Sequence, residues 1–229
     1  MATDSVKITR TKSIYKIEFN YSSPQLIKSL IKTYIISGAS TDKYYKTLNF
    51  KANSIKTLNQ YLKEYGEPHK SGHSFVFKGG FKYLVTQLNY LITQESCSVL
   101  GYHPSEILVI NDDIFIFIGI EFISGIKEND MITISSPFLH TDLFISPEML
   151  TITELPSFIH YKTAYFSLAV LIIYCLVGDD DFYMDYLKHK QPEKIIALLN
   201  NNPIKNTRIY WLLSRCLVEE ASNRSIILI

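Results

Sequence analysis

The stretch GYHPSEILVINDDIFIFIGIEF, residues 101–122, decides the fold of this chain of 229 residues. Two apolar runs, Ile107 to Ile110 and Ile114 to Ile118, flank the sequence Asn111-Asp112-Asp113. Asn and Asp accept the backbone conformations of tight turns, so this pattern predicts a β-hairpin. The polar loop before the hairpin raises the question of whether the stretch performs chemistry or only supports the fold.

On the N-terminal side of this hairpin the pattern predicts a small sheet and then helices. Residues 5–21 alternate around a turn at Thr11-Lys12-Ser13, as a hairpin does. Other elements follow from β-branched composition or from apolar residues at helical spacing. We predict a helix capped by Ser23, a strand over residues 43–51, a helix from Ser54 to Gly66 and an amphipathic helix from Phe75 to about Ser96.

On the C-terminal side the chain is mainly helical. The run AYFSLAVLIIYCLV, Ala164 to Val177, has no charged residue and is shorter than the about 20 residues that span a membrane. A short helix that is apolar on all sides must be surrounded by protein, so we predict a buried core helix. Two further helices are expected in PEKIIALLN and TRIYWLLSRCLVEE, which completes an α+β fold.

Composition narrows the classes of function. The chain carries 23 basic and 22 acidic residues, a net charge of +1, so charge gives no reason to expect nucleic acid or an anionic membrane as the main partner. Its three cysteines share no metal-ligand spacing. The N-terminus has no apolar stretch typical of a signal peptide. We expect a cytoplasmic protein with reduced thiols and no membrane span.

Several stretches, taken in order, resemble the protein kinase family. The stretch FKYLVTQLNYLITQ resembles the long helix before the kinase catalytic loop, and PSEILVINDDIFIFI is similar to the PENILV run and the strands after it. Ser146-Pro147-Glu148 resembles the Ala-Pro-Glu motif, and FSLAVLIIYCL resembles the core helix of the large lobe. The ending NRSIILI and the short first region look most like kinase-like proteins of large DNA viruses.

This resemblance implies a two-lobed kinase-like fold. Residues 1–51 would form a reduced N-terminal β lobe, and residues 52–229 a mainly helical C-terminal lobe. Arg224 matches the arginine that pairs with the glutamate of Ala-Pro-Glu, so we expect an ion pair with Glu148. A poorly hydrated carboxylate is stabilised by a bidentate arginine, which gives the pair a structural role.

At the positions of phosphoryl transfer the sequence departs from the family. Phosphoryl transfer requires a glycine-rich loop, a lysine, metal-binding groups and a proton acceptor. The first hairpin has no glycine, and Lys16, Lys28 and Lys32 lie in no pattern typical of the phosphate-binding lysine. Val99-Leu100-Gly101 stands at the His-Arg-Asp position, where Gly101 replaces the proton acceptor.

The metal-binding positions have changed as well. Glu106 stands where the family has a magnesium-binding asparagine. It is a weak candidate for a cofactor ligand, and the sequence offers no other. Ile118-Gly119-Ile120 occupies the Asp-Phe-Gly position, and isoleucine cannot bind a metal ion. Ala164 replaces the buried aspartate of the core helix. We predict no catalytic residue and no metal site.

Other polar residues have simpler interpretations. His103 is expected to be a surface residue rather than a substitute base. The acidic pairs and runs, Asp112-Asp113 and Asp179-Asp180-Asp181, are expected to be solvated rather than to hold a metal ion.

Three functions are compatible with this pattern. The first is a pseudokinase that acts through protein–protein binding and needs no cofactor, with a partner whose identity the sequence does not give. The second is a divergent serine/threonine protein kinase that retains ATP and magnesium through Glu106. The third is a structural or virion-associated protein. A viral protein would act in the host cytoplasm or in the virion.

Overall fold

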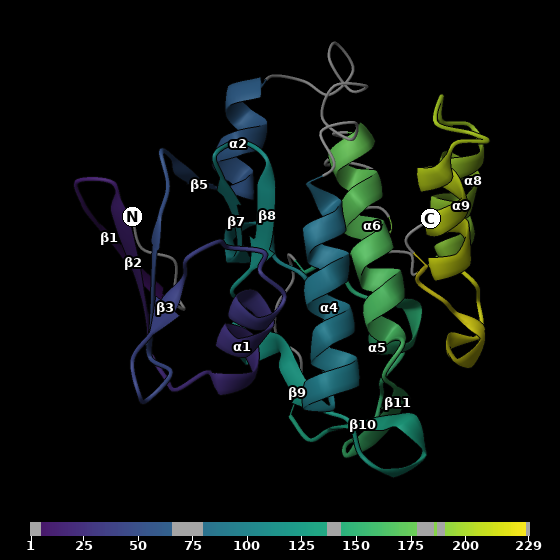
Figure 1. Ribbon diagram of the computed structural model, residues 1–229. Helices are drawn as coiled ribbons and strands as arrows, with labels where there is room; N and C mark the ends of the chain where they lie inside the picture. The colour runs from purple at the N-terminus through teal and green to yellow at the C-terminus, as the bar shows by residue number, and fades with distance from the viewer. Residues whose placement is uncertain (1–5, 66–79, 137–142, 178–185, 187–190, 228–229) are drawn as a thin grey trace. The chain divides into compact units, whose positions relative to one another are not determined.

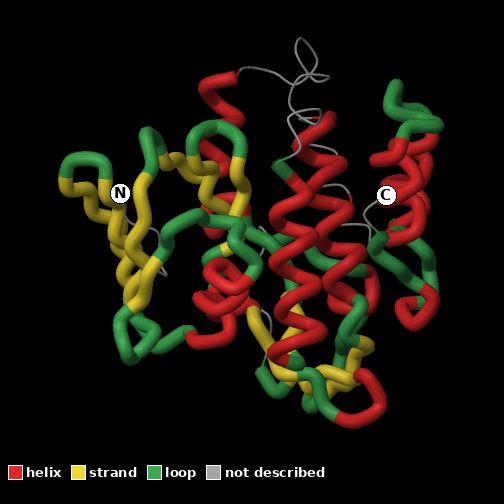
Figure 2. The backbone as a smooth tube through the Cα atoms, viewed as in Figure 1, coloured by secondary structure: helices red, strands yellow, loops and turns green. Residues whose placement is uncertain are grey.

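The computed structural model describes residues 6–65, 80–136, 143–177, 186 and 191–227, drawn as ribbon in Figure 1 and by secondary structure in Figure 2. It is an α+β protein with several small antiparallel sheets. The chain divides into two compact units. Unit 1 takes its described residues from 6–65, 80–97 and 103–123, and unit 2 from 98–102 and from residue 124 onward.

Unit 1 begins with a four-stranded sheet in the order β1-β2-β4-β3. The predicted first hairpin is confirmed, and its turn contains Lys12 at a φ of 57°. The covered face of the sheet is apolar and packs Tyr15, Ile17, Phe19 and other residues into the core. The four strands are β1 (Val6–Thr11), β2 (Ile14–Phe19), β3 (Ser40–Thr41) and β4 (Thr47–Lys51).

Helix α1 (Pro24–Lys32) connects β2 to β3. Its apolar positions Leu26, Ile27 and Leu30 are buried, as the helical spacing predicts. Ser23 is the N-cap residue, but its hydroxyl donates to the carbonyl of Tyr21 (3.1 Å) rather than accepting from the helix. Ser23 therefore occupies the predicted N-cap position and the helix begins where it was expected, although the side chain makes no capping hydrogen bond.

A three-stranded sheet, in the order β5-β7-β8, holds the hairpin of residues 107–117. The predicted turn is confirmed, because Asn111 and Asp112 adopt positive φ values of 53° and 58°. The Asn111 side chain accepts hydrogen bonds from the backbone N–H groups of Asn53 (2.7 Å) and Ser54 (3.2 Å), which fixes the start of β5. The strands are β5 (Ile55–Thr57), β7 (Ile107–Ile110) and β8 (Ile114–Phe117).

The helix predicted from Ser54 begins later, at Leu58. Residues 55–57 pair with β7 instead, so tertiary strand pairing overrides the local helical pattern. Thr57 and Gln60 then form a capping box: the Thr57 N–H donates to Oε1 of Gln60 (3.0 Å), and the Gln60 N–H donates to Oγ1 of Thr57 (3.3 Å). The predicted end of this helix at Gly66 lies outside the described residues.

The other helices of unit 1 are α2 (Leu58–Tyr65) and α4 (Phe81–Glu95). The long amphipathic helix expected from Phe75 is confirmed from Phe81 onward, and residues 75–79 are outside the described part of the chain. Helix α4 packs against β8 and α1. Short 3₁₀ turns occupy Pro104–Glu106 and Ile120–Phe122.

Unit 2 is built around α6 (Thr163–Val177), the predicted core helix. Its residues from Thr163 to Ile173 are all buried, so the prediction of a helix surrounded by protein is confirmed. Helices α8 (Pro192–Asn200) and α9 (Arg208–Cys216) pack against it and lie side by side in Figure 1. Within the described residues, no helix combines the length and apolarity needed to cross a bilayer.

The rest of unit 2 consists of short elements. A two-stranded antiparallel sheet joins β10 to β11, with Thr133 opposite Phe158. Strands β6 and β9 form another two-stranded sheet, and each passes along the chain from unit 1 into unit 2. The remaining elements are β6 (Cys97–Val99), β9 (Ile123–Gly125), β10 (Met131–Ile134), α5 (Pro147–Leu150), β11 (Ser157–His160) and 3₁₀ turns at Glu128–Asp130 and Ala221–Asn223.

Candidate functional site

Val99, Leu100 and Gly101, which the resemblance aligns with His-Arg-Asp, lie in unit 2. Val99 and Leu100 are buried, with exposed fractions of 1% and 7%. A Cβ atom on Gly101 would lie 2.7 Å from Cγ2 of Ile145 and 3.2 Å from the carbonyl oxygen of Phe144. These distances are shorter than ordinary van der Waals contacts. A side chain at this position would therefore displace the segment around Ile145.

Backbone pairing holds Gly101 in this position. Its neighbour Tyr102 forms a β-bridge with Phe144. The Tyr102 N–H donates to the Phe144 carbonyl (3.1 Å), and the Tyr102 carbonyl accepts from the Phe144 N–H (2.8 Å). The Tyr102 side chain is buried, and burial raises the pKa of its hydroxyl far above the ordinary value. Neither Gly101 nor Tyr102 supplies a base near neutral pH.

The two polar candidates after this loop are His103 and Glu106. His103 is half-buried rather than a plain surface residue, and its Nδ1 accepts a hydrogen bond from the Ser105 N–H (3.1 Å). This contact caps the 3₁₀ turn that follows. Glu106 is buried, with 4% of its surface exposed, and its backbone carbonyl accepts from the Ile118 N–H (2.8 Å).

The segment Ile118-Gly119-Ile120, which the resemblance aligns with Asp-Phe-Gly, is apolar and tightly packed. Ile118 is fully buried, and Ile120 is half-buried. A Cβ atom on Gly119 would lie 2.7 Å from Cδ2 of Phe122 and 2.8 Å from Cζ of Phe117. The three residues offer no side-chain oxygen for a metal ion.

Gln87 of α4 holds the end of the hairpin just before this position. Its side-chain amide donates to the carbonyl of Phe117 (2.8 Å) and accepts from the Phe117 N–H (2.9 Å), and the residue is 1% exposed. Sequence reasoning missed this contact. The signal was present, because Gln87 is a polar residue among the apolar helix positions Leu84, Leu88 and Leu91.

The three lysines considered for phosphate binding are placed apart. Lys16 lies on the face of β2 opposite to the buried Tyr15 and Ile17, and its Nζ lies 3.3 Å from Oε2 of Glu18. Lys28 connects α1 to α4 through an ion pair with Glu95 (3.2 Å), which the sequence did not predict. Lys32 is exposed at the end of α1.

The carboxylates of the hairpin turn do not form a metal site. Oδ1 of Asp112 lies 3.4 Å from Nζ of Lys56, so this residue is paired rather than simply solvated, whereas Asp113 is exposed. The run Asp179-Asp180-Asp181 lies outside the described residues. Within the part of the chain that is described, no group of three or more His, Cys, Asp or Glu side chains converges as a metal site would require.

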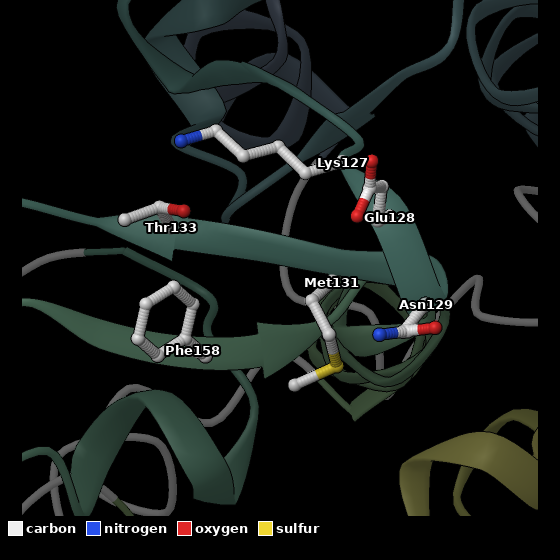
Figure 3. Close-up of a pocket in the computed structure, with 6 residues that line it drawn as sticks. All are labelled: Lys127, Glu128, Asn129, Met131, Thr133 and Phe158. Atoms are coloured by element: carbon white, nitrogen blue, oxygen red, sulfur yellow. The ribbon is translucent and has the colours of Figure 1, made fainter.

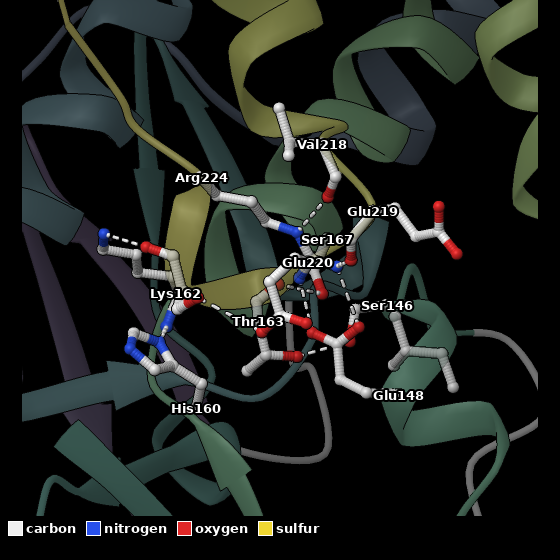
Figure 4. A network of polar contacts seen from close by, with 12 residues as sticks. Ser146, Glu148, His160, Lys162, Thr163, Ser167, Val218, Glu219, Glu220 and Arg224 are labelled. Carbon is white, nitrogen blue, oxygen red and sulfur yellow. Dashed lines mark hydrogen bonds and ion pairs between the residues drawn. The ribbon is translucent and has the colours of Figure 1, made fainter. Parts of the chain in front are cut away.

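Glu148 and Arg224, the pair expected from the resemblance, meet in unit 2 (Figure 4). Nη1 of Arg224 lies 2.5 Å from Oε1 of Glu148, and Nη2 lies 3.0 Å from Oε2. Arg224 also donates from Nε to the carbonyl of Val218 (2.7 Å) and from Nη2 to that of Glu219 (2.9 Å). Its guanidinium lies 4.9 Å from the ring centre of Phe166.

Burial and pairing shift the pKa of Glu148 in opposite directions. Burial of the carboxylate alone would raise its pKa, but the hydrogen bonds and positive charge of Arg224 outweigh this effect. The pKa of Glu148 is therefore lowered, and the pair is ionised near neutral pH. Arg224 itself is fully buried, so the contact joins α5 to the end of the chain without exposing its guanidinium.

The N-terminus of α6 lies in the same network. The hydroxyls of Ser146 and Thr163 are hydrogen-bonded to each other, and both residues are fully buried. Ala164, which the resemblance aligns with a buried aspartate, is also fully buried. The Lys162 ammonium donates to the carbonyl of Ser222 (2.7 Å), a second link between this region and the chain end.

A separate hollow of about 650 Å³ lies along the β10–β11 sheet (Figure 3). Thr133 and its cross-strand neighbour Phe158 lie on the same face of the sheet, and Phe158 is 61% exposed. The hollow combines an aromatic ring with charged and amide groups at its margin. Its lining residues are Lys127, Glu128, Asn129, Met131, Thr133 and Phe158.

The three thiols are poor candidates for nucleophiles. Cys97, Cys175 and Cys216 are free and buried. Burial raises the pKa of Cys216 to about 12, and it also raises the pKa values of Cys97 and Cys175. The reactive thiolate is therefore disfavoured at all three positions.

No family model and no curated protein matched this chain in the comparisons.

Proposed function

We propose that this protein is a pseudokinase: a protein with a two-lobed kinase-like fold that does not transfer phosphate and acts by binding another protein. One observation carries the proposal. The positions that the resemblance assigns to the proton acceptor and to the metal-binding aspartate hold Gly101 and Ile118, and both are closed by packing. At Gly101 the space for a side chain is already filled, so substitution alone would not restore a proton acceptor there. At Ile118 a carboxylate would be buried, which disfavours its charged form.

The order of elements supports the kinase-like part of the proposal. A small sheet interrupted by α1 is followed by the long helix α4, the β7–β8 hairpin and the buried helix α6. The Glu148–Arg224 pair also fits the family pattern, in which these two positions stabilise the end of the large lobe. We propose residues 1–51 as the reduced small lobe, residues 52–229 as the large lobe, and the degenerate kinases of large DNA viruses as the nearest type.

The distribution of side chains on β2 supports the second part of the proposal, the absence of phosphate transfer. Tyr15, Ile17 and Phe19 occupy the covered face of this strand and are buried. Lys16 lies on the other face, in contact with Glu18. A phosphate group on the covered face would meet apolar side chains, which cannot neutralise its charge.

One observation favours the alternative of a divergent serine/threonine kinase. Glu106 is a buried carboxylate at the position of a family magnesium ligand, and its backbone is hydrogen-bonded to Ile118. A magnesium ion would need further oxygen ligands, and the neighbouring Ile118 provides none from its side chain. We therefore place this function second.

The test is a titration of the full chain with ATP, with and without magnesium, by calorimetry and thermal shift. A ligand that binds only the folded state raises the melting temperature. We expect no heat of binding and no shift up to millimolar nucleotide. Saturable, magnesium-dependent binding would overturn the proposal, and its loss in Glu106→Gln, but not in Glu121→Gln, would establish the alternative. Glu121 is the matched control because it is exposed and lies close in sequence.

A further inference from the structure

Helix α9 presents two different faces. Leu212, Leu213 and Cys216 are buried. Arg208, Trp211 and Arg215 are exposed and follow the spacing i, i+3 and i+7, which places them on one side of a helix. We call these three residues the Arg-Trp-Arg stripe.

Trp211 is the central residue of this stripe. It is the single tryptophan of the chain, and 51% of its surface is exposed. Its ring contacts Tyr210 edge to face, with the ring centres 5.1 Å apart, so the indole is supported on one side. Tyr210 in turn is anchored by a hydrogen bond to Asn200 of α8 (2.8 Å). A supported, half-exposed indole is typical of the residues that dominate binding at protein interfaces.

The two arginines of the stripe have no partner within the described part of the chain. Neither Arg208 nor Arg215 takes part in an ion pair there, whereas Lys28 and Arg224 both do. They lie seven positions apart on the helix, which corresponds to about 10 Å along the axis. The stripe thus offers two positive charges on either side of an apolar centre.

We propose that the Arg-Trp-Arg stripe of α9 docks an acidic amphipathic helix of a partner protein. Two carboxylates seven residues apart on such a helix would match the spacing of Arg208 and Arg215, and an apolar side chain between them would cover Trp211. The arginines suit this role because a guanidinium binds a carboxylate in a bidentate manner. This inference rests on the proposed protein-binding function and specifies its surface.

The surroundings of α9 favour a protein over a nucleic acid. Glu219 and Glu220 are exposed just beyond the helix, so the positive charge ends close to Arg215. A phosphate backbone carries charge continuously and would meet these carboxylates. A helix with separate acidic positions can avoid them. The net charge of +1 also provides no wider basic surface to attract a polyanion.

The single tryptophan makes the test specific to this site. We would titrate the full chain with an alanine-based helical peptide that carries glutamates seven residues apart and leucines between them, and record Trp211 emission. The control peptide has glutamine in place of each glutamate. We expect saturable movement of the emission to shorter wavelength with the acidic peptide, because the indole becomes covered, and a much weaker response with the neutral one.

Two double variants distinguish docking at the stripe from a general effect of positive charge on peptide binding. Arg208→Gln with Arg215→Gln should weaken binding of the acidic peptide about tenfold. Lys7→Gln with Lys51→Gln removes the same charge from exposed residues of the unit 1 sheet and should leave binding unchanged. Both double variants should keep the parental melting temperature, because all four side chains are exposed.

Three outcomes would overturn this inference: no emission change with the acidic peptide, an equal response to both peptides, or a stronger response to a single-stranded oligouridine. The last result would assign the stripe to nucleic acid. The ATP titration distinguishes this failure from failure of the proposed function. If the chain binds neither the acidic peptide nor ATP, only the docking surface is contradicted. If the chain binds ATP, the pseudokinase proposal is contradicted.

Discussion

Arg224 and Glu148 lie 76 residues apart in the sequence and form a bidentate ion pair, with N–O distances of 2.5 and 3.0 Å. The arginine is fully buried, and it also donates to the carbonyls of Val218 and Glu219. A single side chain therefore neutralises a carboxylate and satisfies two backbone acceptors. This contact stabilises the connection between α5 and the end of the chain. Its role is structural and does not involve a bound substrate.

Replacing Arg224 with alanine should destabilise the protein strongly. The change leaves Glu148 without its partner and removes the donors to both carbonyls, which together should lower the free energy of unfolding by about 3–5 kcal/mol. Arg224→Lys should recover only part of this loss, because an ammonium cannot reproduce the planar set of donors. Urea unfolding followed by circular dichroism measures the difference.

Arg208→Ala is the matched control for this prediction. Arg208 is exposed and forms no ion pair within the described residues, so its loss should change stability by less than about 0.5 kcal/mol. Equal effects of the two substitutions would show that the Glu148–Arg224 pair does not contribute more to stability than an exposed arginine does.

The Glu148–Arg224 pair should also make the stability of the protein depend on pH. The pKa of Glu148 is lowered in the folded chain from its ordinary value of 4.5, so the unfolded chain takes up this proton at higher pH. The contribution of the pair is therefore fully present above about pH 4.5 and is lost as the pH falls through the folded pKa.

We would measure the urea midpoint of the parent and of Glu148→Gln from neutral pH to about pH 3. The parent should be more stable at neutral pH, and the gap between the two proteins should narrow below pH 4.5, since other carboxylates titrate in both. A gap that stays constant with pH would contradict the assigned role of the carboxylate.

Gln87→Leu should destabilise unit 1 although leucine suits a buried helix position. The substitution leaves the N–H and carbonyl of Phe117 without the partners seen at 2.9 and 2.8 Å. Each buried group left unsatisfied costs about 1–3 kcal/mol, so a loss of at least about 2 kcal/mol is expected. Gln94→Leu, at an exposed position of the same helix, is the control and should be nearly neutral in chemical denaturation.

Gly101→Ala and Gly125→Ala should differ in their effect on stability, although the chemical change is the same. The new methyl group at Gly101 meets Ile145 and the Phe144 carbonyl, whereas nothing lies within 4 Å of the corresponding atom at Gly125. Overpacking should cost about 1–3 kcal/mol at Gly101. Thermal unfolding of the two variants compares them directly, and equal melting temperatures would refute the close packing.

The local pattern of the sequence was sufficient for most elements of regular structure. Alternation predicted the first hairpin, helical spacing predicted α1 and α4, and the charge-free run predicted the buried helix α6. These patterns are reliable because each reflects a single requirement, the burial of one face or of all faces. The turn at Asn111 was predictable for the same reason, since its residue types tolerate positive φ values.

The start of α2 could not be predicted in this way. Residues 55–57 have helical periodicity, but they pair with β7, which is more than fifty residues away in sequence. The energy of that pairing depends on where the chain folds back, and the helical periodicity of the segment does not contain this information. The capping box at Thr57 and Gln60 was visible in the sequence and would have corrected the boundary.

For the candidate site, the sequence by itself determined what is present: Gly101 and Ile118 stand where the resemblance places reactive groups, and Glu148 and Arg224 are available to pair. Only the tertiary structure decided that Gly101 has no room for a side chain, that Gln87 holds Phe117, and that Arg208, Trp211 and Arg215 stay uncovered on α9. The physical reason is that residue type sets the chemistry of a position, whereas packing density and exposure depend on neighbours that are distant in sequence.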